Sequence, residues 1–412
     1  MKRHLIGIGG VGMSALATAL VRLGDEVTGA DRTLGTPNIK FLESLGVKVY
    51  PDDGSGVDSA TDEVIVSTAI EETNAGLIKA KELGIPVTHR AKALSRTLKD
   101  YKLVAVVGTC GKSTVTAMLG YVLAECGLDP MCVNGANVPG WEGAVRFGKG
   151  EYAVAEVDES DKSLVAFKPY AAIVTNASAD HYSKEEMDEV FDAFVKDCEG
   201  PVIDGRKGLE GLGGLEVPIP GKHNLQNAQH AVLMAIALGV EPEKAIAAMK
   251  TFRGVERRLQ LITSQTFQTS KPPKPVVYDD YAHNPEKLKA MWMTLAEKHP
   301  GGICVIWRPH GYAPLRKMMD ALAAMFAETV RPQDKLLLLP VYDAGGTTDR
   351  SVNSDELKSK VKGEVEQRIE LVPDLDAAYA WCEAHKGDYA AFVTCGARDP
   401  GLPVLARRLS EM

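Results

Sequence analysis

The sequence predicts an α/β protein made of three domains, each built around a mostly parallel β-sheet. Short apolar runs of strand length alternate with amphipathic helical stretches along most of the chain, which is typical of parallel sheets covered by helices. The length of 412 residues corresponds to two or three domains of roughly 150 residues. A composition of 45% hydrophobic and 25% charged residues excludes a largely disordered or collagen-like chain.

The first domain is expected over residues 1–100 and is predicted to be Rossmann-like. Strands are predicted, in order, at residues 4–8, 26–30, 47–50, 63–67 and 86–88. Helical patterns lie between them, for example at 11–23 and 73–83. The polar stretch 96–101 is interpreted as the linker to the next domain.

The second domain is expected over residues 101–253, with a parallel sheet of the P-loop ATPase type. A buried-strand run at 103–107 leads through a glycine-rich turn into a helix that ends near residue 126. Further strands are predicted at 152–156 and 171–175, and a helix at 224–238 closes the domain.

The third domain, residues 254–412, is again predicted to be a Rossmann-like, doubly wound sheet. Its strands are predicted at 276–279, 303–306, 336–339, 370–372 and 391–394, with helices between them.

Charge and cysteine content limit the partners and the compartment. The net charge of −8 argues against nucleic acid or an anionic membrane as the main partner. No apolar run reaches the roughly 18 residues of a spanning helix. The N-terminus imitates a secretory signal, but four glycines interrupt it and favour a strand–loop–helix. Seven cysteines without a C-x-x-C pair indicate neither a disulfide framework nor a zinc site, so a reducing, cytoplasmic location is expected.

Two glycine-rich turns, each between a strand and a helix, are predicted to bind phosphate. In the first, Gly7-x-Gly9-x-x-Gly12 is followed by Asp31, which is typical of a diphosphate site with an acidic residue for a ribose. Alone it would suggest a nicotinamide enzyme, and a tight turn without a ligand stays an alternative. In the second, Gly108-Thr109-Cys110-Gly111-Lys112-Ser113-Thr114 places a lysine for β/γ-phosphates and a hydroxyl for Mg²⁺. Val106 stands where a full P-loop has glycine, so this loop is shortened.

Acidic and imidazole groups follow the next strands of the second domain. The run 156–161 (E-V-D-E-S-D) follows one strand, and Asp180-His181 follows the next. Ends of neighbouring parallel strands meet at one edge of a sheet, where ligands bind. We therefore expect a second metal there, with solvated acidic loops as the alternative.

Taken together, these sites resemble the Mur ligase family over nearly the whole chain. Seven stretches carry the resemblance in family order: G-I-G-G-V-G-M-S (7–14), G-T-C-G-K-S-T (108–114), E-V-D-E-S-D (156–161), T-N-A-S-A-D-H (175–181), P-G-K-H-N-L-Q-N-A (220–228), F-R-G-V-E-R-R (252–258) and D-D-Y-A-H-N-P (279–285). Within the family, the chain is most similar to the branch that adds L-alanine to UDP-N-acetylmuramate in the synthesis of peptidoglycan precursors.

The resemblance implies an ATP-dependent ligase that forms an amide bond through an acyl phosphate, with ATP and Mg²⁺ as cofactors. It implies that Lys112, Glu156 and His181 are catalytic, and that Ser113, Glu156 and His181 hold Mg²⁺. The implied ATP-binding residues are Gly108, Thr109, Gly111, Lys112, Ser113, Thr114, His223, Asn224, Asn227, Asp280, and Arg258 or its neighbour Arg257. The partners would be a UDP-sugar acid and an amino acid, and the chain a monomer or homodimer.

The remaining candidates lie at strand ends of the outer domains. For the UDP substrate they are Gly9, Gly10, Gly12, Asp31, Ser67, Thr68, His89 and Arg90. His310, Arg350 and Arg398 are candidates for the amino-acid carboxylate, because an arginine fork fits a carboxylate bidentately.

The chain departs from the family pattern at several places. Cys110 stands where the phosphate loop usually has histidine, and Gly311 replaces an arginine in R-P-H-G-Y (308–312). The central domain is shortened between His181 and Pro220, where only 201–204 and 215–219 are predicted as strands. Lys196 lies where several family members carry a carbamylated lysine, although a solvated helix lysine is the alternative.

These departures leave the amino acid and the acceptor open. A Mur-like ligase for a recycled peptide or a non-UDP carboxylate is one alternative. A catalytically silent nucleotide-binding regulator is another, and the intact Lys112, Glu156 and His181 speak against it.

Overall fold

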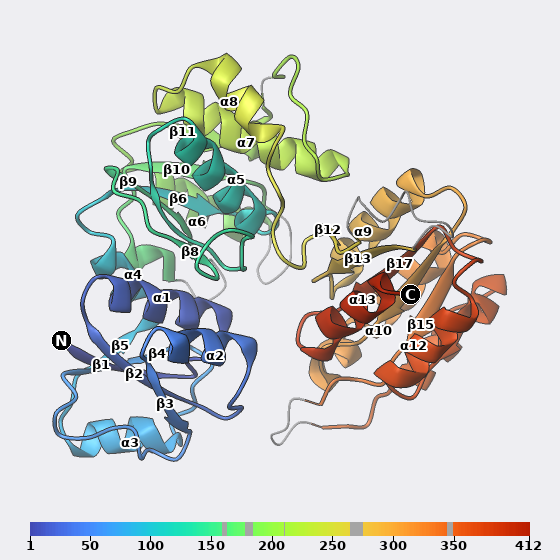
Figure 1. The fold of residues 1–412 in the computed structure, drawn as a ribbon, viewed down its shortest axis with the longest axis horizontal. Coiled ribbons are helices and arrows are strands. Elements are labelled where there is room, and N and C mark those ends of the chain that lie inside the picture. The colour runs from blue at the N-terminus through green and yellow to red at the C-terminus, as the bar shows by residue number, and fades with distance from the viewer. Residues whose placement is uncertain (159–162, 178–183, 210, 264–274, 344–348) are drawn as a thin grey trace. The chain divides into compact units, whose positions relative to one another are not determined.

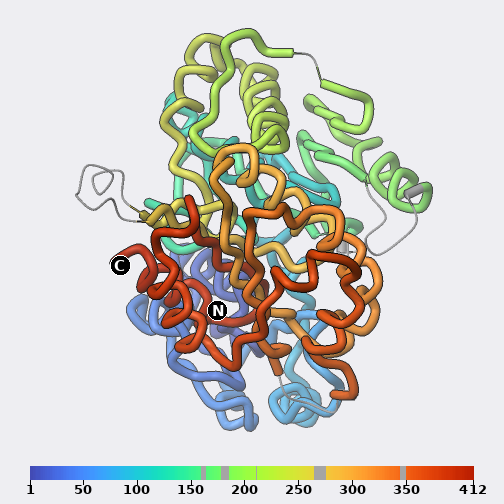
Figure 2. Tube along the Cα trace, turned by 90° about the vertical axis from the view of Figure 1, so that its right-hand side faces the viewer, coloured from blue at the N-terminus to red at the C-terminus, as the bar shows by residue number. Residues whose placement is uncertain are grey.

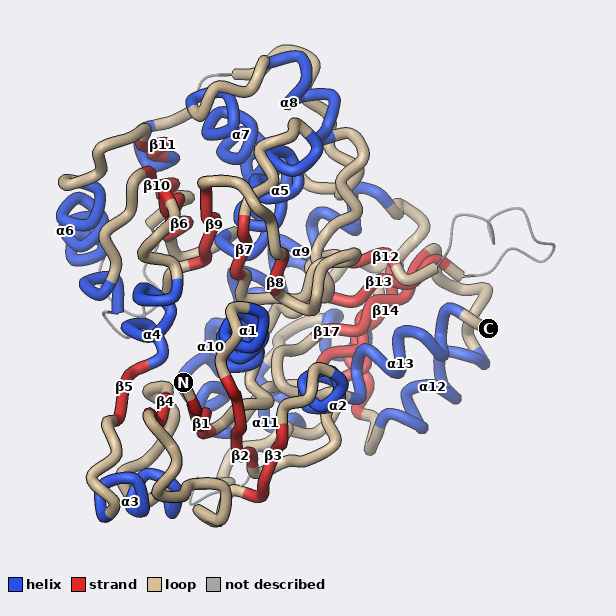
Figure 3. The backbone as a smooth tube through the Cα atoms, turned by 60° about the vertical axis from the view of Figure 1, so that its left-hand side comes forward, coloured by secondary structure: helices blue, strands red, loops and turns tan. Residues whose placement is uncertain are grey.

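The chain forms three β-sheets, each with helices packed against it, in a computed structural model (Figures 1 and 3). The structure describes residues 1–158, 163–177, 184–209, 211–263, 275–343 and 349–412; the others are grey in Figures 1 and 2. Strands that are mostly parallel alternate with helices along the chain, so the predicted α/β class is confirmed.

The first sheet is parallel throughout, in the order β3-β2-β1-β4-β5. Its elements are β1 (Lys2–Ile6), α1 (Val11–Arg22), β2 (Glu26–Asp31), α2 (Pro37–Ser44), β3 (Lys48–Pro51), β4 (Glu63–Val66), α3 (Ala75–Glu82), β5 (Val87–His89) and α4 (Arg90–Thr97). The strand order reverses between β1 and β4, and in open α/β sheets ligands bind outside the carboxyl ends of the strands at such a point.

Helix α4 corrects the predicted linker, whose first residues lie inside this helix. The Nδ1 atom of His89 accepts the backbone N–H of Ala91 and so caps the helix. Ala91, Ala93 and Leu94 are buried, and this packing outweighs the polar character that suggested a linker.

The second sheet has the order β11-β10-β6-β9-β7-β8, and only β8 runs antiparallel to its neighbour. Its elements are β6 (Lys102–Val107), α5 (Lys112–Glu125), β7 (Met131–Val133), β8 (Val145–Arg146), β9 (Tyr152–Glu156), β10 (Ala171–Val174), α6 (Lys184–Val195), β11 (Val202–Asp204), α7 (Lys222–Ala237) and α8 (Pro242–Met249). The carboxyl ends of β10, β6 and β9 are neighbours, so the loops that follow them share one edge.

Between β10 and α7 the described residues contain a single strand, β11. The predicted strand at 215–219 is wrong, since these residues form irregular backbone. Pro218 has no N–H to donate to a strand ladder, and glycines at 211, 213 and 214 precede the segment. Arg206 binds the carboxylates of Asp188 and Asp192 on α6 and of Asp204 on β11, and so ties that helix to the edge strand.

The third sheet has the order β12-β13-β17-β14-β15-β16, with β12 antiparallel to β13 and the others parallel. Its elements are β12 (Gln260–Leu261), β13 (Val276–Asp280), α9 (Pro285–Lys298), β14 (Ile303–Trp307), α10 (Tyr312–Thr329), β15 (Lys335–Leu338), α11 (Ser354–Lys360), β16 (Ile369–Leu371), α12 (Leu375–Ala384), β17 (Ala391–Cys395) and α13 (Gly401–Ser410).

By its contacts the chain divides into two compact units. One comprises Met1–Pro218 and His223–Val255, and the other Ile219–Lys222 and Glu256–Met412. The first unit holds two sheets, which share one hydrophobic core, and an ion pair joins Arg22 of α1 to Glu142 with distances of 2.8 and 2.6 Å. In the described part of the chain, every helix is too short or too polar to cross a membrane.

Candidate active site

The phosphate loop between β6 and α5 needs glycine at two positions. Gly108 has a φ of +126°, and a Cβ atom there would lie 2.2 Å from the hydroxyl of Thr175. Gly111, the N-cap of α5, has a φ of +88°, and its Cβ would lie 2.5 Å from the side-chain oxygen of Asn227. Both the backbone conformation and the space exclude a side chain, so the loop presents bare backbone at the start of a helix.

The loop is held by the end of the neighbouring strand β10. Asn176 accepts the N–H of Cys110 and donates to its carbonyl, both at 2.9 Å, and the Thr175 hydroxyl donates to the same carbonyl at 2.7 Å. Neither residue was among the predicted site residues. Both stand inside the quoted motif T-N-A-S-A-D-H (175–181), but the motif does not reveal their bonds to Cys110.

Polar side chains of the loop point to phosphate chemistry. Lys112 donates its Nζ to the carbonyl of Gly108 at 2.7 Å, within the loop itself. Thr109, Ser113 and Thr114 are buried in the loop and the first turn of α5. The predicted phosphate-binding set therefore lies together at one edge of the second sheet.

Glu156 ends β9, next to β6, at the edge where the sequence predicts a metal. Its Oε2 atom accepts the N–H of Gly135 at 2.8 Å. Carboxylate and hydroxyl oxygens such as those of Glu156 and Ser113 are of the kind that suits Mg²⁺, which takes one or two carboxylates and completes its shell with phosphates and water. Within the described ranges no group of three or more His, Cys, Asp or Glu side chains could hold a metal. The predicted ligand His181 lies outside the described residues.

Lys196 is exposed immediately after α6. Such exposure is typical of an ordinary solvated lysine.

Helix α7 brings a distant part of the sequence to the phosphate loop. Asn224 and Asn227 are buried and joined by a 3.3 Å hydrogen bond, and Asn227 contacts Gly111 as described above. His223 lies in the first turn, where burial lowers the pKa of its imidazole, so the ring is neutral at neutral pH.

The first glycine loop is fixed by the acidic residue predicted to contact a ribose. Asp31 ends β2 and accepts the N–H of Gly9 at 2.9 Å, which holds the turn around Gly10 in place. The guanidinium of Arg90 lies beside Gly12, 3.2 Å from the position that a Cβ would occupy. A cation therefore faces the N-terminus of α1, as a diphosphate site requires.

The other candidates of the first sheet lie at the same edge. Ser67 and Thr68 follow β4 directly, and His89 ends β5. Because β4 and β5 run parallel to β1, these side chains share the carboxyl edge with the glycine loop.

In the third sheet, two consecutive arginines have different surroundings. Arg257 forms an ion pair with the buried Asp279 at 3.1 Å and donates to the carbonyls of Gly396 and Ala397. Arg258 lies over the ring of Tyr281, 5.2 Å from its centroid, and makes no hydrogen bond or ion pair with any described residue. Of these two candidates for an ATP-binding arginine, Arg258 is therefore the one whose guanidinium makes no hydrogen bond to a described residue.

Two aspartates end β13, and burial raises the pKa of both. Asp280, the predicted ribose ligand, accepts the N–H groups of Leu259 and Ala282, both at 2.7 Å. Asp279 has a pKa of about 6, because burial outweighs the opposing charge of Arg257 and the hydroxyl of Thr394.

The predicted amino-acid ligands divide into two groups. His310 follows β14, and its ring lies 4.8 Å from that of His283, while Arg398 is exposed after β17. Burial, and then the charges of neighbouring cations, lower the pKa of each histidine to about 4. Arg350 instead holds the carboxylate of Asp343 bidentately, at 2.7 and 3.0 Å, so its fork already binds a carboxylate of the chain. His283 was not predicted, although it stands inside the quoted motif D-D-Y-A-H-N-P.

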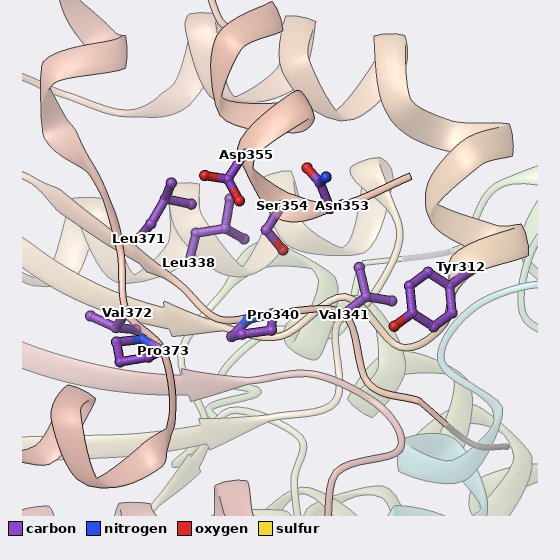
Figure 4. Close-up of a pocket in the computed structure, with 10 residues that line it drawn as sticks. All are labelled: Tyr312, Leu338, Pro340, Val341, Asn353, Ser354, Asp355, Leu371, Val372 and Pro373. Atoms are coloured by element: carbon purple, nitrogen blue, oxygen red, sulfur yellow. The ribbon is translucent and has the colours of Figure 1, made fainter. Parts of the chain in front are cut away.

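A separate cavity of about 340 Å³ opens at the carboxyl ends of β15 and β16 (Figure 4). Leu338, Val341, Leu371 and Val372 supply apolar lining, and Asn353, Ser354 and Asp355 supply polar lining from the start of α11. None of the predicted site residues lines this cavity.

Comparison with known proteins identifies the family. The model of the Mur ligase family, catalytic domain, matches residues 2–102, and that of the Mur ligase, glutamate ligase domain, matches residues 257–398. A UDP-N-acetylmuramate–L-alanine ligase of Sinorhizobium fredii is 30% identical over 468 aligned positions that cover 99% of this chain and 97% of the relative. The ligase of the same name from Desulforamulus reducens is 31% identical, and the alignment covers 97% of this chain and 95% of the relative.

Solved structures give the same fold. The UDP-N-acetylmuramate–alanine ligase of Thermotoga maritima matches with a TM-score of 0.77 and 25% identity, covering 100% of this chain and 98% of the other. A murein peptide ligase of Psychrobacter arcticus matches with a TM-score of 0.67, covering 99% of this chain and 98% of the other. Its sequence identity is 21%, so this match shows the fold alone. With relatives of this identity along nearly its whole length, the chain belongs to the Mur ligase family of ATP-dependent ligases.

Proposed function

We propose that this protein joins L-alanine to the carboxylate of UDP-N-acetylmuramate, with ATP and Mg²⁺, in the cytoplasm. The observation that carries the proposal is the shared edge of β10, β6 and β9, which places the phosphate loop beside Glu156. The curated relatives are named for this substrate and this amino acid, and they match nearly the whole chain.

In the first step, a substrate carboxylate oxygen attacks the γ-phosphorus of ATP, an acyl phosphate forms and ADP leaves. The backbone N–H groups at the start of α5 and the Lys112 ammonium stabilise the charge on the transferring phosphoryl group. Ser113 and Glu156 are the described residues that would hold Mg²⁺, which supplies further charge neutralisation when bound. Asn224 and Asn227 on α7 would flank the nucleotide.

In the second step, the neutral amine of the amino acid attacks the acyl carbon. The tetrahedral intermediate collapses, phosphate leaves, and the nitrogen loses a proton as the amide forms. The amino-acid carboxylate would face Arg398 beside the neutral imidazole of His310. By the resemblance to the family, Arg258 would contact the ATP phosphates, and Asp280 the ribose.

The UDP substrate would bind with its diphosphate on the first glycine loop. The N–H groups in the first turn of α1, which include that of Gly12, and the guanidinium of Arg90 would supply the anion-binding groups. Asp31 supports the loop, while Ser67, Thr68 and His89 line the same sheet edge.

The decisive experiment measures ADP release and identifies the product by mass spectrometry. UDP-N-acetylmuramate is offered with a panel of amino acids, and L-alanine with other acceptors that include a free murein tripeptide. Amide formation from UDP-N-acetylmuramate and L-alanine supports the proposal. Turnover only with a peptide acceptor would show that a murein peptide, and not UDP-N-acetylmuramate, is the substrate. ATP binding without turnover for any pair of substrates would favour a nucleotide-binding regulator.

Lys112→Ala tests the role of the phosphate loop in the same assay. We expect a loss of about 100- to 1,000-fold in kcat, the effect of removing one group that stabilises transition-state charge. Lys102→Ala is the matched control, because Lys102 pairs with Glu151 on the surface at 2.8 Å and should leave kcat unchanged.

A further inference from the structure

Two buried polar side chains behind the phosphate loop have no hydrogen-bond partner among the described residues. Asn134 directly follows β7 and is 2% exposed, and neither the nitrogen nor the oxygen of its amide is paired. Thr116 lies on α5 with no exposed surface, and its hydroxyl is likewise unpaired. Each unmet buried polar group costs about 1–3 kcal/mol, so these two positions call for an explanation.

The geometry of α5 and β7 places these side chains opposite each other. The Cys132 sulfur of β7 lies 2.6 Å from the position of a Cβ on Gly120, so these two residues face each other. Thr116 is one helical turn before Gly120, and Asn134 is two residues after Cys132. Because α5 connects the parallel strands β6 and β7 and runs back against them, both steps lead toward the carboxyl edge of the sheet.

The hydroxyl of Thr116 departs from the usual behaviour of threonine in a helix. Thr18, Thr97 and Thr294 each donate to the carbonyl four residues earlier at 2.8 Å, whereas Thr116 makes no such bond. Its hydroxyl is therefore free for another partner on the β7 side. A water molecule has the size and the two to four hydrogen bonds that an amide and a hydroxyl in such a place need.

Each member of the pair has a neighbour at one of the groups expected to hold the metal. Ser113 is three residues before Thr116 on the same face of α5. Gly135, next to Asn134, donates its N–H to the Glu156 carboxylate at 2.8 Å. We propose that Asn134 and Thr116 are positioning residues for Mg²⁺–ATP, which share a trapped water and fix the first turns of α5 relative to the segment that holds Glu156. The inference rests on the proposed function of this site as an Mg²⁺–ATP site.

The test compares Thr116→Val with Thr116→Ser in the full-length protein. Valine keeps the shape and removes the hydroxyl, and serine restores it. Binding of a non-hydrolysable ATP analogue is measured by calorimetry over a range of Mg²⁺ concentrations and in EDTA. We expect Thr116→Val to raise the Mg²⁺ requirement on the order of 10-fold, the usual effect of losing a group that supports a metal ligand, with affinity in EDTA unchanged. Thr116→Ser should restore the wild-type Mg²⁺ requirement.

Asn134→Leu provides a second variant, and it should shift the Mg²⁺ requirement in the same direction. A change in melting temperature without any change in the Mg²⁺ requirement would show a merely structural role and overturn the inference. A crystal structure at high resolution without a water between the two side chains would overturn the bridging role.

The wild-type protein separates this inference from the proposed function. If wild type binds the nucleotide with Mg²⁺ but makes no amide, the proposed substrates are wrong and the comparison of variants still decides the inference. If nucleotide binding by the wild-type protein does not depend on Mg²⁺, both the proposed function and this inference are wrong.

Discussion

At the scale of single residues, hydrogen bonding divides two arginines that are neighbours in sequence. Arg257 is committed to the buried Asp279 and to two carbonyls, in a backbone conformation with a φ of +59°, while Arg258 projects over Tyr281 without such bonds to described residues. The two aspartates that end β13 are both bonded within the chain: Asp279 pairs with Arg257, and Asp280 accepts two backbone N–H groups.

This division predicts opposite outcomes for two alanine substitutions. Arg257→Ala leaves Asp279 buried without its cation, so we expect a loss of about 3–5 kcal/mol in stability. Arg258→Ala should leave the melting temperature near that of wild type and raise the KM for ATP. Thermal unfolding and steady-state kinetics measure both, and the assignment fails if Arg257→Ala is as stable as wild type.

Motif residues of the site could be predicted from the sequence, whereas their supports could not. Gly108, Gly111 and Lys112 stand in a recognisable spacing, and the structure places them together at the start of α5. Thr175 and Asn176 act through side-chain bonds to a loop 65 residues away, and spacing along the chain carries no record of such contacts. The sequence likewise does not predict that the carboxylate of Asp343 binds the guanidinium of Arg350.

At the scale of elements, close packing of α7 against the start of α5 restricts the phosphate loop. Gly111 caps α5 with a positive φ, and the Asn227 side chain of α7 fills the space where a side chain would go. Two helices far apart in sequence therefore define one turn.

Gly111→Ala should destabilise the protein for two separable reasons. The left-handed backbone costs a non-glycine residue about 1–2 kcal/mol, and the contact with Asn227 adds a steric cost. Adding Asn227→Ala should recover the steric part only, which chemical unfolding of the single and double variants would measure. Additive losses in the double variant would contradict the contact.

The carboxyl edge of the third sheet should respond to acid. His283 and His310 have pKa values of about 4, below the ordinary 6.5, because both rings are buried. Between these values the unfolded chain binds more protons, so stability falls as the pH drops from about 6.5 to 4, by up to about 3 kcal/mol for His283 and by less for the more exposed His310, where solvent screens the charge. The raised pKa of Asp279 acts in the opposite sense, since stability from that group is lost as the pH rises through about 6.

Chemical unfolding between pH 4 and 7 measures this response. His310→Gln should show a weaker loss of stability toward acid than wild type, because glutamine takes up no proton. An identical pH dependence in the two proteins would rule out the buried, neutral imidazole.

The elements themselves could largely be predicted from the sequence. Strands such as β9 and β14 are continuous apolar runs, which identify buried parallel strands. The short strands β7, β8 and β12 were not predicted. They have two or three residues each, and pairing with a neighbouring strand, not a local sequence pattern, defines them. The polar surface of α4 suggested a linker, because its burial depends on packing that the sequence does not display.

At the scale of the molecule, the first two sheets are joined by both a shared core and a surface ion pair. Arg22, in the last turn of α1, donates two hydrogen bonds to the carboxylate of Glu142, which lies in the segment between β7 and β8. Both side chains are about 40% exposed, so the pair is screened by water and salt. The apolar core therefore carries most of the attachment.

A double-mutant cycle with Arg22→Ala and Glu142→Ala should give a coupling of only about 0.2–1 kcal/mol, which shrinks as salt is added. Thermal unfolding at low and high ionic strength measures it. A coupling of several kcal/mol, or one that salt does not reduce, would mean that the pair is the main attachment.

The chain is also short for its relatives: the 468 aligned positions exceed its 412 residues by 56, so at least that many face gaps. The sequence predicts that the missing length falls mainly between His181 and Pro220, and β11, in this interval, is the outer strand of its sheet. An outer strand offers unpaired backbone groups to which another molecule could add a strand, and proteins limit this with short strands and charges. With three residues and the ion cluster of Asp204 and Arg206 at its end, β11 has both of these features.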